Sequence, residues 1–178
     1  MIIKNTKLND CYYFDLKKFL DNRGFFFEIS HQSKYKNYIK KKIVQTNFSH
    51  SKKNVFRGMH FQVKNPQGKL LTVLSGKIKD IIIDLRKQSS TYGKVDVVNL
   101  SEKKNQQIWI PEGFGHGFIS LTDKVKIIYQ CTDFYYPKYE KTLSYKDPKF
   151  KNIIKNIKFK VSNKDLTGLS FNEVEKII

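Results

Sequence analysis

The sequence predicts an all-β fold, in which many short strands form a sandwich or a barrel. Short apolar runs alternate with turns rich in glycine, asparagine and aspartate along most of the 178 residues. Segment 76–84 interleaves polar and apolar residues in the register of a strand. The helical signal is weak until the ends of the chain. Many short strands with regular spacing are typical of a sandwich or barrel.

The expected strands are rich in β-branched and aromatic residues, and most of them begin after a glycine or a polar turn. Segment 24–29 follows the turn at Asn22, and segment 76–84 starts at Gly76. Segment 107–110 ends at Pro111, which cannot donate to a sheet ladder. The full set is 12–14, 24–29, 43–49, 55–62, 69–75, 76–84, 93–100, 107–110, 117–120 and 125–131. Short helices are expected at 31–38, 149–152 and 172–178.

The length of the chain predicts one domain, 1–178, with a substantial core. No apolar run approaches the roughly 20 residues of a membrane span, and the first residues lack the profile of a signal peptide. We therefore expect a cytoplasmic protein that does not associate with a membrane. Cys11 and Cys131 are far apart and lack C-x-x-C spacing, which predicts two reduced thiols.

The formal net charge of +18 raises the possibility of nucleic-acid binding. The basic residues are spread along the chain, however, and only Arg23, Arg57 and Arg86 of the 34 are arginine. The densest cluster, 40–42, leads into an expected strand and is typical of a solvated edge. The distribution of charge therefore argues against a nucleic-acid partner. Two of the arginines lie beside glycines, where a guanidinium fork could grip a phosphate.

Two of the four histidines lie among glycines and aromatic residues, next to apolar runs of strand type. They are His60, in the segment Arg57-Gly58-Met59-His60-Phe61-Gln62, and His116, in Pro111-Glu112-Gly113-Phe114-Gly115-His116. Such surroundings can partly desolvate an imidazole and bring it to a ligand. The pattern indicates a functional site inside the β fold.

The segment around His116 resembles the second motif of cupins, whose fold is a jelly-roll barrel. The first motif of metal-binding cupins supplies paired histidines and a glutamate, whereas here His60 is followed by Phe61 and Gln62. Two distant imidazoles are a poor ligand set for zinc or iron, which take three or four donors. We expect an all-β, cupin-type jelly-roll barrel with a few short helices, no metal and no other cofactor.

A longer series of motifs extends over nearly the whole chain. They are Asp21-Asn22-Arg23-Gly24-Phe25-Phe26-Phe27-Glu28, Gln45-Thr46-Asn47-Phe48-Ser49, Arg57-Gly58-Met59-His60-Phe61-Gln62, Gln67-Gly68-Lys69-Leu70, Asp84-Leu85-Arg86, Tyr129-Gln130-Cys131-Thr132-Asp133-Phe134-Tyr135 and Pro137-Lys138-Tyr139-Glu140. In order and spacing these stretches resemble the dTDP-4-dehydrorhamnose 3,5-epimerases, a deoxysugar epimerase family of the cupin superfamily. A Trp-Pro pair usual after the residues matching Asp147-Pro148 is absent here.

The resemblance implies epimerisation beside a ketone, which needs a base, an acid on the opposite face and a donor for the enolate oxygen. It implies that His60 is the base, that Tyr129 is the acid and that Asp165 orients the imidazole. Lys69 is the candidate to hold the ketone oxygen. The implied substrate is dTDP-4-dehydro-6-deoxy-D-glucose, converted to dTDP-4-dehydro-L-rhamnose by inversion at carbons 3 and 5.

The resemblance also implies a site for a nucleotide-diphosphate sugar. Arg23, Arg57 and Lys164 would face the phosphates, Tyr135 would stack on the base, and His116 would lie near the sugar. Glu28, Gln45, Asn47 and Glu140 would hydrogen-bond the base or sugars. The family is usually dimeric with an exchanged N-terminal strand, so a homodimer is expected. Phe25, Phe26, Phe27 and Phe118 are expected mostly in the barrel core.

Three other functions remain open from the sequence. A relative could invert one carbon only, or accept another nucleotide or sugar. A non-catalytic cupin could bind a sugar nucleotide, although His60 and Tyr129 are both present. A basic barrel could bind nucleic acid, for which arginines interleaved with aromatics on one face would be expected.

Overall fold

The computed structural model describes residues 2–155 and 157–178 and consists mainly of antiparallel sheets. The all-β prediction is confirmed. The strands are β1 (Ile2–Asn5), β2 (Tyr12–Asp15), β3 (Lys18–Asp21), β4 (Gly24–Phe27), β5 (Gln45–Ser51), β6 (Phe56–Gln62), β7 (Lys69–Ser75), β8 (Lys77–Asp84), β9 (Val95–Ser101), β10 (Gln106–Ile110), β11 (Phe114–Ser120), β12 (Val125–Cys131) and β13 (Glu140–Thr142). The short helices are α1 (Gln32–Tyr35), α2 (Lys151–Ile154), α3 (Asn163–Leu166) and α4 (Phe171–Glu175), with 3₁₀ turns at Glu102–Lys104, Pro137–Tyr139 and Pro148–Phe150.

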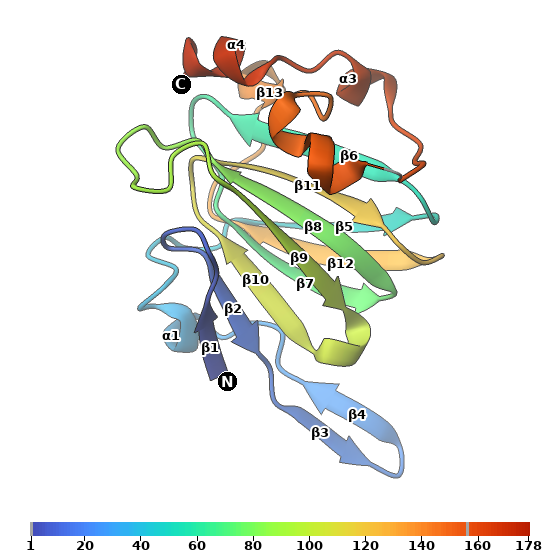
Figure 1. Ribbon diagram of the computed structural model, residues 1–178. Coiled ribbons are helices and arrows are strands. Elements are labelled where there is room, and N and C mark those ends of the chain that lie inside the picture. The colour runs from blue at the N-terminus through green and yellow to red at the C-terminus, as the bar shows by residue number, and fades with distance from the viewer. Residues whose placement is uncertain (1, 156) are drawn as a thin grey trace.

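Two large sheets face each other and form the jelly-roll barrel (Figure 1). One sheet has six strands in the order β1-β2-β10-β7-β12-β5, and the other has five in the order β13-β6-β11-β8-β9. The C-terminal helices lie across the outer side of the five-stranded sheet, near β6 and β13 (Figure 1). Strands distant in sequence are therefore neighbours, which brings the two histidine motifs together on β6 and β11.

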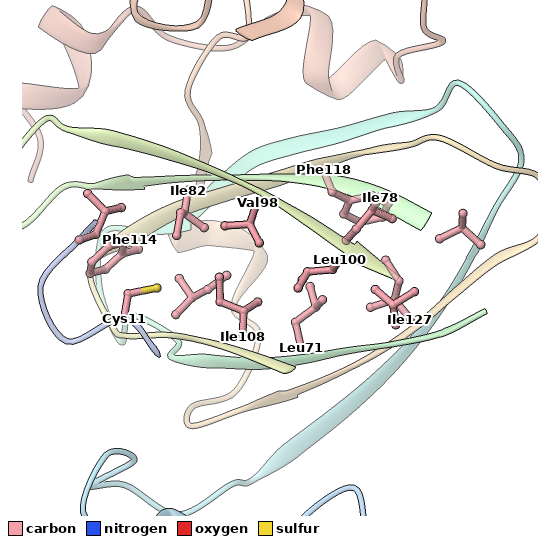
Figure 2. Close-up of a cluster of buried hydrophobic side chains, with 14 residues drawn as sticks. Cys11, Leu71, Ile78, Ile82, Val98, Leu100, Ile108, Phe114, Phe118 and Ile127 are labelled. Carbon is pink, nitrogen blue, oxygen red and sulfur yellow. The ribbon is translucent and has the colours of Figure 1, made fainter. Parts of the chain in front are cut away.

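The core lies between the two sheets. Figure 2 shows apolar side chains such as Leu71, Ile82 and Ile127 pointing into this space from both sides. In β12 the buried Val125 and Ile127 alternate with the exposed Lys126, as expected for a strand with one face toward a core. Burying each large apolar side chain stabilises the fold by about 1.5–3 kcal/mol.

Strand β8 is buried on both faces. Ile78 and Ile82 point into the space between the sheets, whereas Ile81 and Ile83 pack outward in a second cluster with Phe150 and other side chains of the C-terminal region. This second core explains why the sequence has the continuous run 81–83 where a sheet with one solvated face would have alternated.

The β3–β4 hairpin lies outside both large sheets and projects from the barrel (Figure 1). Phe25 and Phe26 are 60 % and 66 % exposed, and Phe19 and Leu20 are also exposed. The prediction that Phe25 and Phe26 belong to the barrel core is therefore wrong, whereas Phe118 is in that core. The run of phenylalanines in segment 25–27 is typical of a buried strand. In the structure, however, β4 pairs only with β3, in a hairpin that lies outside the barrel.

The sequence did not predict the short strands that are defined by pairing with strands distant in the chain. Strands β1 and β13 are only three or four residues long and are defined by pairing with β2 and β6. The predicted helix 31–38 is shorter, as α1. Both cysteines are buried free thiols. Within the described ranges, no helix has the length and apolar character needed to cross a membrane.

Candidate active site

A cavity of about 510 Å³ opens between the two sheets. Strands β6 and β11 supply one wall, β5, β7 and β12 supply the facing wall, and residues 160–165 of the C-terminal segment close one side. His60, Lys69, His116, Tyr129 and Asp165 all line it. The barrel therefore gathers the predicted catalytic residues, together with His116, around one space.

Two glycines allow β6 and β11 to approach closely beside this cavity. A Cβ on Gly58 would lie 2.4 Å from Gly117 Cα, and one on Gly117 would lie 2.7 Å from the Arg57 carbonyl oxygen. Gly58 also has a φ of +135°, which side chains rarely adopt. The register of the two strands shifts at this point, and His60 lies directly opposite His116. The glycines thus set how the two imidazoles are spaced.

His60 is held by Asp165 from the C-terminal segment. Its Nε2 lies 2.6 Å from Asp165 Oδ1, although the two residues are 105 positions apart. Asp165 stands at this place because the Ser162 hydroxyl accepts a hydrogen bond from the Asp165 backbone N–H, capping α3. The carboxylate fixes the orientation of the imidazole and leaves Nδ1 as its second ring nitrogen.

The Asp165 side chain is only 4 % exposed. Burial disfavours its charge, but the hydrogen bond and charge interaction with His60 and the hydrogen bond from Ser162 outweigh burial and hold the pKa of Asp165 below its usual value. A charged carboxylate behind the ring stabilises the imidazolium that forms when the ring accepts a proton.

Tyr129 and Lys69 reach the cavity from the wall opposite His60. Burial, together with the Cys131 thiol and Glu140, raises the pKa of Tyr129, so the phenol stays protonated near neutral pH and is able to donate a proton. Burial lowers the pKa of the Lys69 amine, while the nearby Cys131 and Glu140 oppose this change. The His60 imidazole, the Tyr129 phenol and the Lys69 amine therefore surround the same space.

His116 forms a second buried histidine–aspartate pair. Its Nε2 lies 2.8 Å from Asp80 Oδ1 on the adjacent strand β8, and the Asp80 side chain is fully buried. The spacing of Asp80 and Asp84 left open which of them would support a histidine. Asp84 instead accepts hydrogen bonds from Arg86, Ser89 and Thr91.

Other predicted binding residues lie at the rim. Arg57 lines the cavity and donates to Ser51 Oγ at 3.0 Å, and Lys164 also lines it. Gln45 and Asn47 project from β5 beside Tyr135: Gln45 Oε1 accepts from the Tyr135 backbone N–H at 2.8 Å, and its amide donates to Asn47 at 3.0 Å.

Tyr135 and Glu140 contact each other at this rim. The Tyr135 hydroxyl donates to Glu140 Oε2 at 2.6 Å, and Lys164 also binds that oxygen. Both residues line a small hollow that shares His60 and Lys69 with the main cavity. The hollow that contains Tyr135 and Glu140 is therefore continuous with the cavity around His60 and Lys69.

Arg23 and Glu28 are not brought to the cavity within this chain. Arg23 is at the tip of the β3–β4 hairpin, 86 % exposed, and donates to Asp21 at 2.6 Å. Glu28 follows β4 and pairs with Lys34. Figure 1 shows the hairpin directed away from β6.

The two central imidazoles do not form a metal-ligand cluster. In the described part of the chain, no group of three or more His, Cys, Asp or Glu side chains is arranged to hold a metal ion. His60 and His116 each direct Nε2 to an aspartate.

Some residues that line the cavity were missed from the sequence. Ser49 faces the same side of β5 as Gln45 and Asn47, so strand alternation could have found it. Lys160 reaches the cavity because it forms a parallel bridge with Val55, which lies more than a hundred residues earlier in the chain, and no local pattern signals such a contact.

Comparison with known proteins places this arrangement in one family. The model of the family dTDP-4-dehydrorhamnose 3,5-epimerase matches residues 5–173. The chain belongs to the dTDP-4-dehydrorhamnose 3,5-epimerase family. A member from Salmonella typhimurium is 43 % identical over 150 residues, covering 83 % of this chain and 82 % of its own. A member from Shigella flexneri is 38 % identical over the full length of both chains.

A solved structure of an epimerase has the same fold as this chain. A dTDP-6-deoxy-D-glucose-3,5-epimerase from Legionella pneumophila, crystallised with dTDP-4-keto-L-rhamnose, superimposes with a TM-score of 0.90 at 37 % identity. The match covers 96 % of this chain and 93 % of that chain.

Proposed function

We propose that this chain epimerises a dTDP-linked 4-keto-6-deoxy sugar at carbons 3 and 5, converting dTDP-4-dehydro-6-deoxy-D-glucose to dTDP-4-dehydro-L-rhamnose. The observation that carries the proposal is the His60–Asp165 pair facing Tyr129 and Lys69 across one cavity, in a member of this epimerase family. A base on one wall and an acid on the other are what inversion at a carbon requires.

In the first step His60 takes the proton from the carbon beside the ketone. The electron pair of the broken C–H bond moves toward the carbonyl oxygen, which becomes an enolate oxygen, and Lys69 stabilises the charge there. Asp165 keeps the ring oriented and stabilises the imidazolium. Tyr129 then gives its proton to the same carbon from the opposite wall, and the ketone re-forms with inverted stereochemistry.

Metal-independent chemistry is part of this proposal. Inversion at each carbon consists of two proton transfers, and the Lys69 amine is the donor for the enolate oxygen. The two imidazoles that line the cavity, His60 and His116, are a poor ligand set for zinc or iron, which take three or four donors.

The nucleotide would occupy the rim of the cavity. Arg57 and Lys164 supply positive charge for the diphosphate, and His116 faces the sugar. Tyr135, whose ring is partly exposed at the rim, would stack on the base, with Gln45 and Asn47 nearby to hydrogen-bond.

A homodimer completes the proposal, with Arg23 and Glu28 supplied to each site by the hairpin of the other subunit. The support is that these residues lie far from their own cavity on a hairpin that exposes Phe25 and Phe26. Exposed aromatic patches of this kind mark contact surfaces. A cytoplasmic location is also part of the proposal, and the two buried free thiols fit the reducing conditions of that compartment.

The direct test is incubation with dTDP-4-keto-6-deoxyglucose in deuterated water without added metal, followed by proton NMR of the sugar. Deuterium at both carbon 3 and carbon 5 is expected. Incorporation at one carbon only would replace the proposal with a single-site epimerase. No exchange at either carbon would overturn it in favour of another substrate or a binding role.

The dimer is tested by subunit mixing. His60→Ala and Arg23→Ala subunits are co-expressed, and the mixed dimers are assayed at substrate concentrations below KM. If Arg23 acts on the partner's cavity, about a quarter of all sites contain both residues and activity rises above that of either variant. If Arg23 acts on its own cavity, no site is intact and mixing restores nothing.

A further inference from the structure

Two short segments near the end of the chain share the pattern Ser-x-x-acid, and each begins a helix at its serine. They are Ser162-Asn163-Lys164-Asp165, which opens α3, and Ser170-Phe171-Asn172-Glu173, which opens α4. In each helix the serine hydroxyl accepts a hydrogen bond from the backbone N–H of the acidic residue. The two segments therefore start as the same capping motif.

The two acidic side chains differ in what they contact. The Glu173 carboxylate turns back and accepts from the backbone N–H of Ser170 at 2.8 Å, which closes a capping box. The Asp165 carboxylate is one methylene shorter and is directed at β6. Its Oδ1 lies 2.6 Å from His60 Nε2, and its Oδ2 accepts from the Gly58 backbone N–H at 3.4 Å. In α3 the acidic residue of the motif thus supplies a carboxylate to the site.

The serine that caps α3 follows a segment that is anchored to the start of β6. Lys160, two residues before Ser162, donates its backbone N–H to the Asn54 carbonyl and accepts from the Phe56 N–H at 2.9 Å. The Ser162 hydroxyl accepts from the Asp165 N–H at 3.2 Å, and the Ser162 carbonyl accepts from the same N–H at 3.0 Å. A series of hydrogen bonds therefore connects β6 through Ser162 to Asp165.

We propose that Ser162 is a positioning residue, whose hydroxyl holds the Asp165 carboxylate against His60 when the imidazole accepts a proton. Helix α3 is only four residues long, so its own helical hydrogen bonds fix the direction of Asp165 weakly. The inference rests on the proposed epimerase function, because it assigns a role within that proton transfer. It adds a residue that acts on the base through Asp165.

The same hydroxyl supports the charge of Asp165. Burial opposes ionisation of this carboxyl, but the hydrogen bond and charge of His60, followed by the hydrogen bonds from Ser162 and the Gly58 N–H, hold the pKa of Asp165 below its usual value. A charged carboxylate can only accept, so His60 Nε2 carries the proton of their hydrogen bond. Ser162→Ala therefore removes one acceptor for the Asp165 backbone and one interaction that favours its charge.

Ser170 offers a matched control. Ser170→Ala removes the same kind of cap from α4, whose Phe171 and Val174 pack in the outer cluster with Ile81. Both alanine variants are expected to lower the unfolding temperature to a similar extent, because each loses one cap. Ser162→Thr is the conservative variant, since threonine keeps a hydroxyl that can cap a helix.

The first measurement follows the His60 ring N–H by NMR of the free protein with ¹⁵N-labelled histidine, which needs no substrate. The signal is assigned by its absence in His60→Ala. Ser162→Ala is expected to speed exchange of this proton with water about fivefold, because a less restrained Asp165 opens the hydrogen bond more often. Ser162→Thr and Ser170→Ala are expected to keep the wild-type rate. An unchanged rate in Ser162→Ala, or an equal rise in Ser170→Ala, would overturn the proposal.

The second measurement is steady-state epimerisation. Ser162→Ala should lower kcat about fivefold and leave KM within about twofold, because Asp165 stabilises the imidazolium that forms after the sugar has bound. Ser162→Thr should restore most of the rate, and Ser170→Ala should leave it unchanged.

Two outcomes of the kinetics decide against parts of this account. A raised KM with unchanged kcat in Ser162→Ala would make the hydroxyl, which lines the cavity, a substrate contact in place of a positioning group. If the wild-type protein epimerises nothing, the proposed function fails, whereas exchange of the ring N–H still decides whether Ser162 holds Asp165 against His60.

Discussion

In the barrel cavity, His60 is fixed by Asp165 from a segment more than a hundred residues away, and the strands around it are buried on at least one face. In the β3–β4 hairpin, Arg23 is held by Asp21 two residues away and is otherwise in solvent. Both regions carry residues of the same predicted site. The single chain brings His60, Tyr129 and Lys69 to one cavity, whereas the hairpin residues would join a site only in the proposed dimer.

The largest expected effect comes from removing the base in the barrel. His60→Ala should lower deuterium exchange into the sugar by about 10³-fold, because no other group is held at the same position by Asp165. The measurement is exchange by NMR, with unfolding temperature as a check on folding. His50→Ala, an exposed histidine on β5, is the control and should retain exchange. Wild-type exchange in His60→Ala would show that another residue is the base.

Tyr129→Phe should separate the two proton transfers. Removal of the phenol proton is expected to lower formation of the inverted product by about 10²-fold, while exchange at the carbon continues through His60. Product and exchange are measured in the same NMR experiment. Tyr38→Phe serves as the control, since Tyr38 packs outside the cavity against Tyr12 and Phe14. Equal loss of exchange and inversion would contradict the assignment of Tyr129 as the acid.

Acid unfolding compares the two regions by their carboxylates. The pKa of Asp165 is lowered in the folded state, so its stabilisation is complete above the usual aspartate pKa of about 4 and is lost as the pH falls through the folded value. Asp165→Asn should lower the free energy of unfolding at pH 7 by about 1.5–3 kcal/mol. Denaturant unfolding should show this difference shrinking below about pH 4.

The control for this comparison is Asp21→Asn in the hairpin. Arg23 also lowers the pKa of Asp21, through side-chain and backbone hydrogen bonds, but this carboxylate is exposed and water screens the pair. The denaturation midpoint should therefore change much less than in Asp165→Asn at every pH. A loss of stability equal to that of Asp165→Asn would remove the distinction between the two regions.

The smallest expected effect is in the hairpin. Arg23→Ala should raise KM about tenfold and leave kcat within about twofold, because an arginine that holds a phosphate contributes to binding before and during the reaction. Steady-state kinetics measure both values. Lys17→Ala, another exposed basic residue next to the hairpin, should change neither. A fall in kcat with unchanged KM in Arg23→Ala would place this arginine at the reacting sugar.

Much of the fold could be predicted because strand alternation and turn residues are local signals. Strands β6 to β8, β10 and β12 lie close to the predicted ranges, whereas β11 begins at Phe114, three residues before the predicted start, and so includes His116. Short elements such as β1 and β13 could not be found in this way, since pairing with β2 and β6 defines them. The aromatic hairpin was placed in the core for a similar reason: composition shows that Phe25 and Phe26 are apolar, but not which surface covers them.

The sequence by itself determined the all-β class and, through its motifs, the resemblance to the epimerase family and the identity of His60, Lys69 and Tyr129 as site residues. The same resemblance implied that Asp165 orients the His60 imidazole. Only the tertiary structure decided that this contact is made at Nε2, that Asp80 supports His116, and that Glu140 lies near the other ring nitrogen of His60. The type of each residue fixes the chemistry of its side chain. The distance between residues far apart in the chain depends instead on how the two sheets and the C-terminal segment pack.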